Sequence, residues 1–158
     1  MIAALVSAVA LGGPLPCYAR DVRSFNGMLT GATGTMDGAV YIRNVSGAPC
    51  AVGRRPRVEV VTRSGMTLRT TERTFALRQA GGRPLSVLRP GGRAVLHLDW
   101  SNWCGAWPTP STHVRLLDLR VTMTAGPRLL LRIRTGRPRC DQPAAPSILY
   151  VSPFATVV

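Results

Sequence analysis

The segment Arg93-Ala-Val-Leu-His-Leu-Asp-Trp100 alternates between two sets of side chains. Every residue of one set is apolar: Ala94, Leu96, Leu98 and Trp100. Because successive side chains of a β-strand point to opposite faces of a sheet, this set predicts a core face. Val95, His97 and Asp99 are then expected on the outward face.

Other segments alternate in the same way and predict further short strands. They span residues 39–45, 57–62, 114–123, 128–135 and 148–151. With 16 glycines and 13 prolines interrupting the chain, the pattern is typical of an all-β fold with many turns. Residues 67–75 are polar and predict an edge strand, whereas residues 81–84 and 90–92 predict turns. The apolar parity switches between Leu116 and Leu117, which predicts a β-bulge.

The length of 158 residues suits one domain with a signal-like leader. Residues 1–16 carry no charged side chain and include an apolar run of about 11 residues. A secretory signal has an apolar core of this length, whereas a helix that spans a bilayer needs roughly 20 residues. We therefore expect residues 1–16 to be a truncated or removed leader, residues 17–158 to be a single β-sandwich domain, and no transmembrane helix.

The cysteine content predicts where the protein resides. The chain has four cysteines, an even number: Cys17, Cys50, Cys104 and Cys140. An even count in a small domain behind an export-like segment predicts a disulfide framework and an extracytoplasmic location, either secreted or in the cell envelope. Structural zinc would need close C-x-x-C or C-x-x-H spacings, and the sequence has neither.

The charge of the chain is strongly positive and comes from arginine alone. Its 20 basic residues include no lysine, they face seven acids, and the formal net charge is +13. Arginine-rich codon usage in a GC-rich genome accounts for this composition without any ligand. The functional interpretation is that planar guanidinium groups recognise phosphate or carboxylate. Under either interpretation the surface should attract polyanions.

Two arginine clusters are the candidate ligand-binding residues. In residues 128–135 the alternation puts leucine and isoleucine in the core, so the arginines share the outer face: Arg128, Arg132 and Arg134. The second cluster is Arg54, Arg55 and Arg57. The expected partner is an anionic envelope component, such as phospholipid, polyphosphate or acidic glycan, or an acidic protein surface. Export and disulfides argue against a specific nucleic-acid role, and solvated arginines without any ligand remain an alternative.

The three tryptophans lie together in Trp100-Ser-Asn-Trp-Cys-Gly-Ala-Trp107, around Cys104. Exposed rings there could stack on sugars. Trp100 lies on the predicted core face and Trp103 adjoins a cysteine, so packing against the core is the favoured interpretation. Trp107 is expected to be the most exposed of the three.

Catalytic or metal chemistry would have to use His97, Asp99 and His113. His97 and Asp99 share the outward face of one predicted strand, which makes a small metal-binding protein or hydrolase the alternative function. The spacing identifies no third partner, and the sequence contains neither G-x-S-x-G nor G-x-x-x-x-G-K-[ST]. We therefore expect no enzyme activity, no cofactor and no metal.

Several motifs occur in an order that resembles the bacterial domain of unknown function 4232, which is found in exported proteins and lipoproteins of high-GC Gram-positive bacteria. In chain order they are Cys17, Gly31-Ala-Thr-Gly34, Ile42-Arg-Asn-Val-Ser-Gly-Ala-Pro-Cys50, Pro56-Arg-Val-Glu-Val, Gly65, Trp100-Ser-Asn-Trp-Cys104, Pro138-Arg-Cys140 and Pro146-Ser-Ile-Leu. Gly53-Arg-Arg-Pro56 is one residue longer than the family's Gly-x-Pro segment.

The resemblance implies an immunoglobulin-like (Ig-like) antiparallel β-sandwich of about 7–9 strands outside the cytoplasm. It carries over no catalytic residues. Together with the order of the cysteines, it predicts that Cys17 pairs with Cys50 and that Cys104 pairs with Cys140. The function expected from the sequence is that of an exported, non-catalytic binding or structural module with a basic surface.

Overall fold

The computed structural model describes residues 13–32, 34–53, 55–74, 83–108, 114–123 and 128–157. Within these ranges the secondary structure consists of twelve β-strands: β1 (Val22–Ala32), β2 (Thr35–Asn44), β3 (Cys50–Ala51), β4 (Arg57–Val61), β5 (Thr67–Leu68), β6 (Thr71–Thr74), β7 (Val87–Leu88), β8 (Arg93–Ser101), β9 (Val114–Thr122), β10 (Arg128–Gly136), β11 (Ile148–Val151) and β12 (Ala155–Thr156). The described residues include no helix long and apolar enough to span a membrane.

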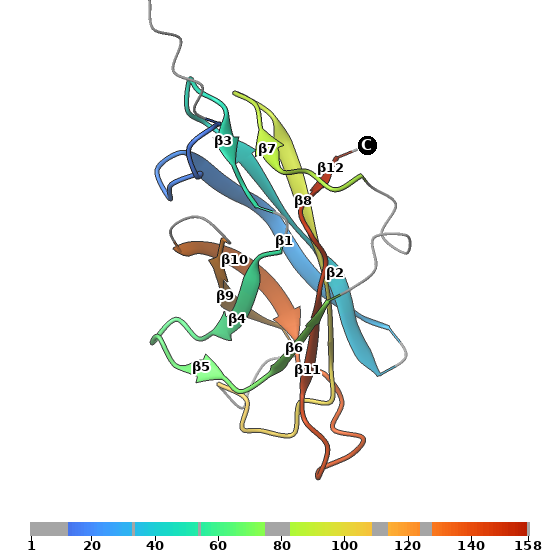
Figure 1. Ribbon diagram of the computed structural model, residues 1–158. Helices are drawn as coiled ribbons and strands as arrows, with labels where there is room; N and C mark the ends of the chain where they lie inside the picture. Colours follow the sequence, from blue (N-terminus) through green and yellow to red (C-terminus); the bar gives the residue numbers. More distant parts are fainter. Residues whose placement is uncertain are drawn as a thin grey trace, which may run out of the picture.

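Most strands form one long curled sheet. Its order is β5-β4-β9-β10-β1-β2-β8-β11-β6, with β12 added to β8, and β3 pairs with β7 in a separate small sheet. In Figure 1, β4, β9 and β10 lie opposite β2, β8 and β11, and β1 connects the two sides. The predicted all-β class is confirmed, but the sheet is a half-barrel rather than two separate layers.

Two strand pairs in this sheet are parallel. β1 runs parallel to β10, and β6 runs parallel to β11, whereas the other named pairs are antiparallel. The prediction of a purely antiparallel fold is therefore wrong at these two places. The reason is topological. β1 joins the two sides of the curled sheet and therefore pairs with both β2 and β10. The chain passes directly from β5, at one end of the strand order, to β6, at the other end, where β6 pairs with β11.

The two edges of the curled sheet lie close together. β5 and β6 stand at opposite ends of the strand order, yet only residues 69 and 70 separate them in the chain. A link this short spans about 10 Å from the last residue of β5 to the first of β6. The carboxylate of Glu72 in β6 also accepts a hydrogen bond from the backbone N–H of Val58 in β4. The predicted edge strand over residues 67–75 is thus two edge strands, and Phe75 lies outside the described residues.

A β-bulge lies in β1, where the register with β2 shifts between Phe25 and Met28. Asn26 has a positive φ of 50° at this point. A Cβ added to Gly27 would lie 2.3 Å from the carbonyl oxygen of Arg132. Glycine at this position therefore allows β1 to approach β10 closely.

The bulge predicted between Leu116 and Leu117 is wrong. β9 pairs with β10 residue by residue from Val114 to Thr122, without a register shift. Leu117 is buried, whereas Leu116 is 40% exposed on the opposite face. The parity switch in the sequence therefore marks an apolar side chain on the outer face, not an extra residue in the strand.

The core lies inside the curl of the sheet and follows the predicted parities. The four apolar residues of β8 with the predicted core parity are all buried: Ala94, Leu96, Leu98 and Trp100. Trp103 is buried as well, and Trp107 packs against the core while remaining partly exposed. The Trp100 ring centroid lies 5.8 Å from that of Trp103 and 6.1 Å from that of Trp107. The tryptophans thus form one core cluster, and Trp107 is the most exposed of the three, as expected.

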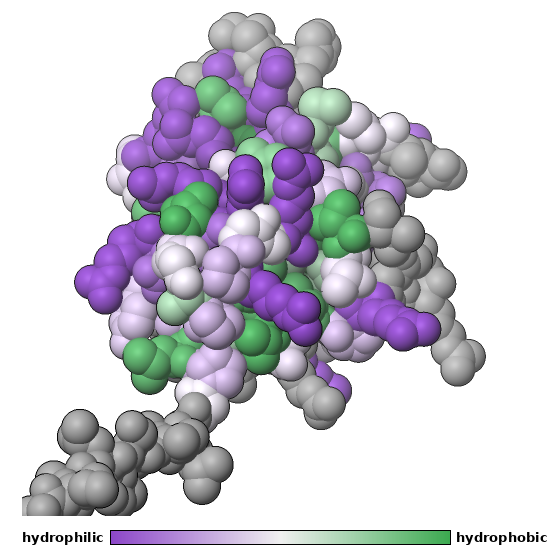
Figure 2. Space-filling model, turned by 90° about the horizontal axis from the view of Figure 1, so that it is seen from above, coloured by the Kyte–Doolittle hydropathy of each residue, from purple (hydrophilic) through white to green (hydrophobic). Residues whose placement is uncertain are grey.

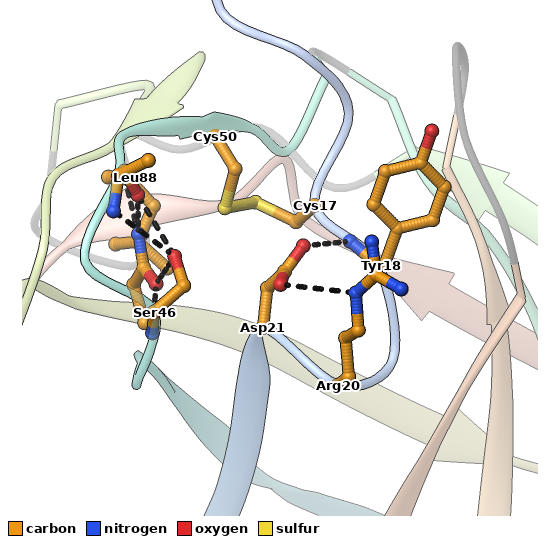
Figure 3. Close-up of a disulfide and its surroundings, with 9 residues drawn as sticks. Cys17, Tyr18, Arg20, Asp21, Ser46, Cys50 and Leu88 are labelled. Carbon is orange, nitrogen blue, oxygen red and sulfur yellow. Dashed lines mark hydrogen bonds and ion pairs between the residues drawn. A yellow bond between two sulfur atoms is a disulfide. The ribbon is translucent and has the colours of Figure 1, made fainter.

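Both predicted disulfides are present. Cys17 is bonded to Cys50, and Cys104 is bonded to Cys140. The first attaches the N-terminal segment to β3, where the Cys17 N–H also donates to the carbonyl of Ala51. Figure 3 shows this disulfide between the Tyr18–Asp21 turn and Ser46, with the Asp21 carboxylate accepting a hydrogen bond from the Tyr18 N–H at 2.8 Å.

An asparagine organises the loop beside each disulfide. Fully buried Asn44 accepts bonds from the N–H and hydroxyl of Ser46, and its amide donates to the carbonyls of Ala48 and Leu88. Asn102, with a positive φ of 53°, plays the same part near Cys104 by bonding the backbone of the loop over residues 141–146. The Asn-Val-Ser-Gly-Ala-Pro-Cys motif is thus a structural turn.

Candidate anion-binding face

The outward side chains of three neighbouring strands form what we call the arginine face. Its members are Arg57 and Glu59 of β4, Leu116, Asp118, Arg120 and Thr122 of β9, and Arg128, Leu130, Arg132 and Arg134 of β10. The intervening residues of these strands point into the core, as strand alternation requires. Many hydrophilic side chains are spread over the part of the molecular surface seen in Figure 2, with hydrophobic side chains between them.

The sheet register brings arginines from different parts of the sequence together. Thr122 pairs with Arg57 on one side and with Arg128 on the other. The Cα atoms of the two arginines are therefore two strand spacings apart, about 10 Å. At the other end of the face, Arg134 pairs with Leu116 of β9 and with Met28 of β1.

Carboxylates on the face offset only part of its charge. Arg120 lies 2.9 Å from Glu59, and Arg132 lies 3.2 Å from Asp118. Arg57, Arg128 and Arg134 make no ion pair with a carboxylate of the described residues. Five arginines against two acids leave the face with an excess of about three positive charges at neutral pH, because guanidinium groups stay protonated.

A small hollow lies at the Thr122 end of the face. It has a volume of about 340 Å³, and three arginines line it: Arg57, Arg69 and Arg128. Glu59 and Glu72 also line it, but Glu59 pairs with Arg120 and Glu72 accepts the Val58 N–H. Three arginines against two carboxylates leave the hollow a positive excess, which suits a phosphate or carboxylate group held through charge-assisted hydrogen bonds.

A second and larger hollow, of about 720 Å³, lies at the Leu116 end. Arg63, Arg115 and Arg134 line it, but only Arg134 belongs to the arginine face, because Arg115 has the inward parity of β9. Leu116, Leu117 and Pro108 give it an apolar wall, and its described lining residues include no carboxylate. The Nε of Arg115 is buried there without a hydrogen-bond partner among the described residues. This hollow therefore combines unpaired positive charge with apolar surface.

Strand parity correctly placed Arg128, Arg132 and Arg134 on the outer face, where all three are exposed. In the second predicted cluster, Arg57 joins the same face, Arg55 is engaged in another contact, and Arg54 lies outside the described residues. Sequence reasoning missed the arginines contributed by other segments: Arg63, Arg69, Arg115 and Arg120. The pairing of β4 with β9 and with β5 brings these segments together, and local alternation carries no such long-range signal.

The predicted His97 and Asp99 do lie on the outward face of β8. There Asp99 is directly opposite Asp37 of β2, a neighbour that the sequence did not predict. Burial raises the pKa of the Asp99 carboxyl, and the nearby Asp37 carboxylate raises it further. Burial lowers the pKa of His97, while Asp37 acts in the opposite direction. His113 lies outside the described residues, and no three potential ligands among those described are arranged to hold a metal.

Searches against protein-family models, curated proteins and solved structures found no match. The fold and the arginine face define the class of protein: an all-β chain with two disulfides and a basic outer face on β4, β9 and β10.

Proposed function

We propose that this protein is an extracytoplasmic, non-catalytic binding module that holds anionic cell-envelope material against the arginine face. One observation carries the proposal: the sheet gathers arginines from three strands on a single outward face, and carboxylates offset only two of them. Like charges on one face repel each other, so the fold gains nothing from them. A bound polyanion would compensate that repulsion.

The extracytoplasmic location is supported by the disulfides and the leader. Two disulfides with no free cysteine are typical of an oxidising compartment. The apolar leader and the resemblance to domain 4232, with its Ig-like fold, belong to the same proposal. In cell fractionation of a strain that carries the full reading frame, we expect the domain in the envelope or the medium without residues 1–16. An intact leader on a protein confined to the cytoplasm would contradict export.

Two properties of the face suit a polyanion with closely spaced charges. Guanidinium groups bind phosphate and carboxylate oxygens in a bidentate way, which gives stronger hydrogen bonds than a diffuse attraction. Unpaired arginines lie at both ends of the face, Arg57 and Arg128 at one and Arg134 at the other, so one extended ligand could contact both ends. Exposed charges are screened by salt, and binding should weaken as ionic strength rises.

A matched pair of double variants tests the proposal. Arg57→Ser with Arg128→Ser removes two unpaired charges from the face, whereas Arg83→Ser with Arg89→Ser removes two exposed charges elsewhere. Affinity for long-chain inorganic polyphosphate should fall about tenfold in the first and less than about threefold in the second, since a site contact contributes more than net charge. Equal losses would mean that only net charge matters and that there is no site.

A further inference from the structure

Three large apolar side chains are exposed on or beside the arginine face. Leu130 is 64% exposed, Met28 50% and Leu116 40%. Leu130 lies between Arg128 and Arg132 on β10 and pairs with Arg120 of β9. Strand alternation puts all three on the outward side of the sheet, so the core does not need them.

The apolar and basic side chains alternate across adjacent strands. In one row of the sheet, Met28 of β1, Arg134 of β10 and Leu116 of β9 lie next to one another. Single exposed apolar residues are normal on protein surfaces, but neighbouring strands here place theirs within one charged patch. Leu116 also lines the larger hollow, together with Arg63, Arg115 and Arg134. The whole face is therefore amphipathic.

We propose that the arginine face docks on the surface of an anionic lipid bilayer, which names the ligand class of the proposed function and rests on it. The arginines contact lipid phosphates, and Leu130, Leu116 and Met28 enter the boundary between headgroups and acyl chains. Interfacial protein surfaces combine basic residues with apolar ones in this way. An acidic glycan or polyphosphate offers the charge but no apolar phase, and would leave the three apolar side chains in water.

Two probes separate lipid binding from simple charge binding. The double variant Leu116→Ser with Leu130→Ser should bind vesicles of equal parts phosphatidylglycerol and phosphatidylcholine at least about tenfold more weakly than the unchanged protein. Its affinity for long-chain polyphosphate should stay within about twofold, because its arginines are unchanged. The control variant Val45→Ser with Val157→Ser removes two apolar side chains, 49% and 40% exposed, that lie outside the arginine face. It should bind both probes as the unchanged protein does.

A fluorescence measurement keeps the test decisive if the double variant folds poorly. The unchanged protein emits from Trp100, Trp103 and Trp107, so the added signal is read as the difference from it. With Leu130→Trp, vesicles should shift this added emission to shorter wavelength, and brominated acyl chains should quench it. Val45→Trp should show neither effect. Unchanged emission from Leu130→Trp on bound vesicles, or full vesicle affinity of a folded leucine variant, would overturn lipid docking while leaving polyanion binding intact. If the unchanged protein binds neither vesicles nor polyphosphate, the proposed function itself is wrong.

Discussion

The carboxylate of Glu72 accepts a hydrogen bond from the backbone N–H of Val58. This contact joins β6, the last strand in the sheet order, to β4 near the other end. β5 pairs only with Val60 and Val61 of β4, so it leaves Val58 unpaired on that side. The Glu72 side chain thus closes part of the open edge of the half-barrel. It also lines the smaller hollow of the arginine face.

Glu72→Ala should lower the free energy of unfolding by about 1–3 kcal/mol, because it leaves the N–H of buried Val58 without its acceptor. Glu59→Ala is the matched control, since it removes an exposed partner of Arg120 and should cost about 0–1 kcal/mol. Urea denaturation of both variants measures the difference. A cost for Glu72→Ala no larger than that for Glu59→Ala would show that the sheet edges do not depend on this contact.

Gly27→Ala should destabilise the protein by about 2 kcal/mol or more, because the new methyl group would collide with the carbonyl of Arg132. Gly47→Ala is the control, since a Cβ there meets no atom within 4 Å. Thermal melts followed by circular dichroism compare the two. Similar melting temperatures would mean that β1 can shift away from β10 without cost.

The disulfides should each contribute about 3–4 kcal/mol, because they close loops with sequence separations of 33 and 36 residues. The double variant Cys104→Ala with Cys140→Ala should therefore melt well below the oxidised protein. Peptide mapping without reduction should recover Cys17 linked to Cys50 and Cys104 linked to Cys140. A Cys50–Cys104 peptide, or four free thiols in the native protein, would refute both the pairing and the oxidising compartment.

Asp99→Asn should stabilise the protein at neutral pH. Because burial and Asp37 raise the pKa of Asp99, the folded state binds its proton more tightly than the unfolded chain does. The stability contribution of this group is therefore present at low pH and is lost as pH rises through the raised pKa. Because Asp99 is partly exposed to solvent, its effect is small. We expect a gain of about 1–2 °C in melting temperature at pH 7 and no gain in acid.

Asp141→Asn is the control for that substitution, because Asp141 is exposed and paired with Arg139. It should give no gain at either pH. A stability gain from Asp99→Asn that persists unchanged in acid would show that repulsion between the two carboxylates is not its cause.

Local alternation was enough to predict most of β2 and the strands β4, β8, β9, β10 and β11 with their buried faces, but not the short strands β3, β7 and β12. The Arg93–Trp100 segment became the central strand β8, and Leu129, Leu131 and Ile133 are buried as expected. Alternation could not predict β1, whose pattern is broken at Asn26 and Gly27 by the bulge. It also carried no information on the parallel pairing of β1 with β10, which depends on contacts between residues far apart in the sequence.

The candidate site was predictable only within one strand. The parity of β10 predicts that Arg128, Arg132 and Arg134 share the outer face. The ion pair between Arg132 and Asp118 depends on the register of β10 with β9, which the sequence does not reveal. The same register places Arg57 and Arg128 on either side of Thr122, two strand spacings apart. Leu116 led to the wrong prediction of a bulge, because an apolar residue on the outer face of a strand looks like a break in the alternation.

The most direct test of the central claim is an NMR titration with inorganic polyphosphate, following the arginine side-chain Nε–Hε signals at constant salt. We expect the signals of Arg57, Arg128 and Arg134 to shift first and saturate together. Arg83 and Arg89, which lie outside the arginine face, should move little. Uniform shifts across all the arginines, or larger shifts at Arg83 and Arg89, would contradict a binding site on β4, β9 and β10.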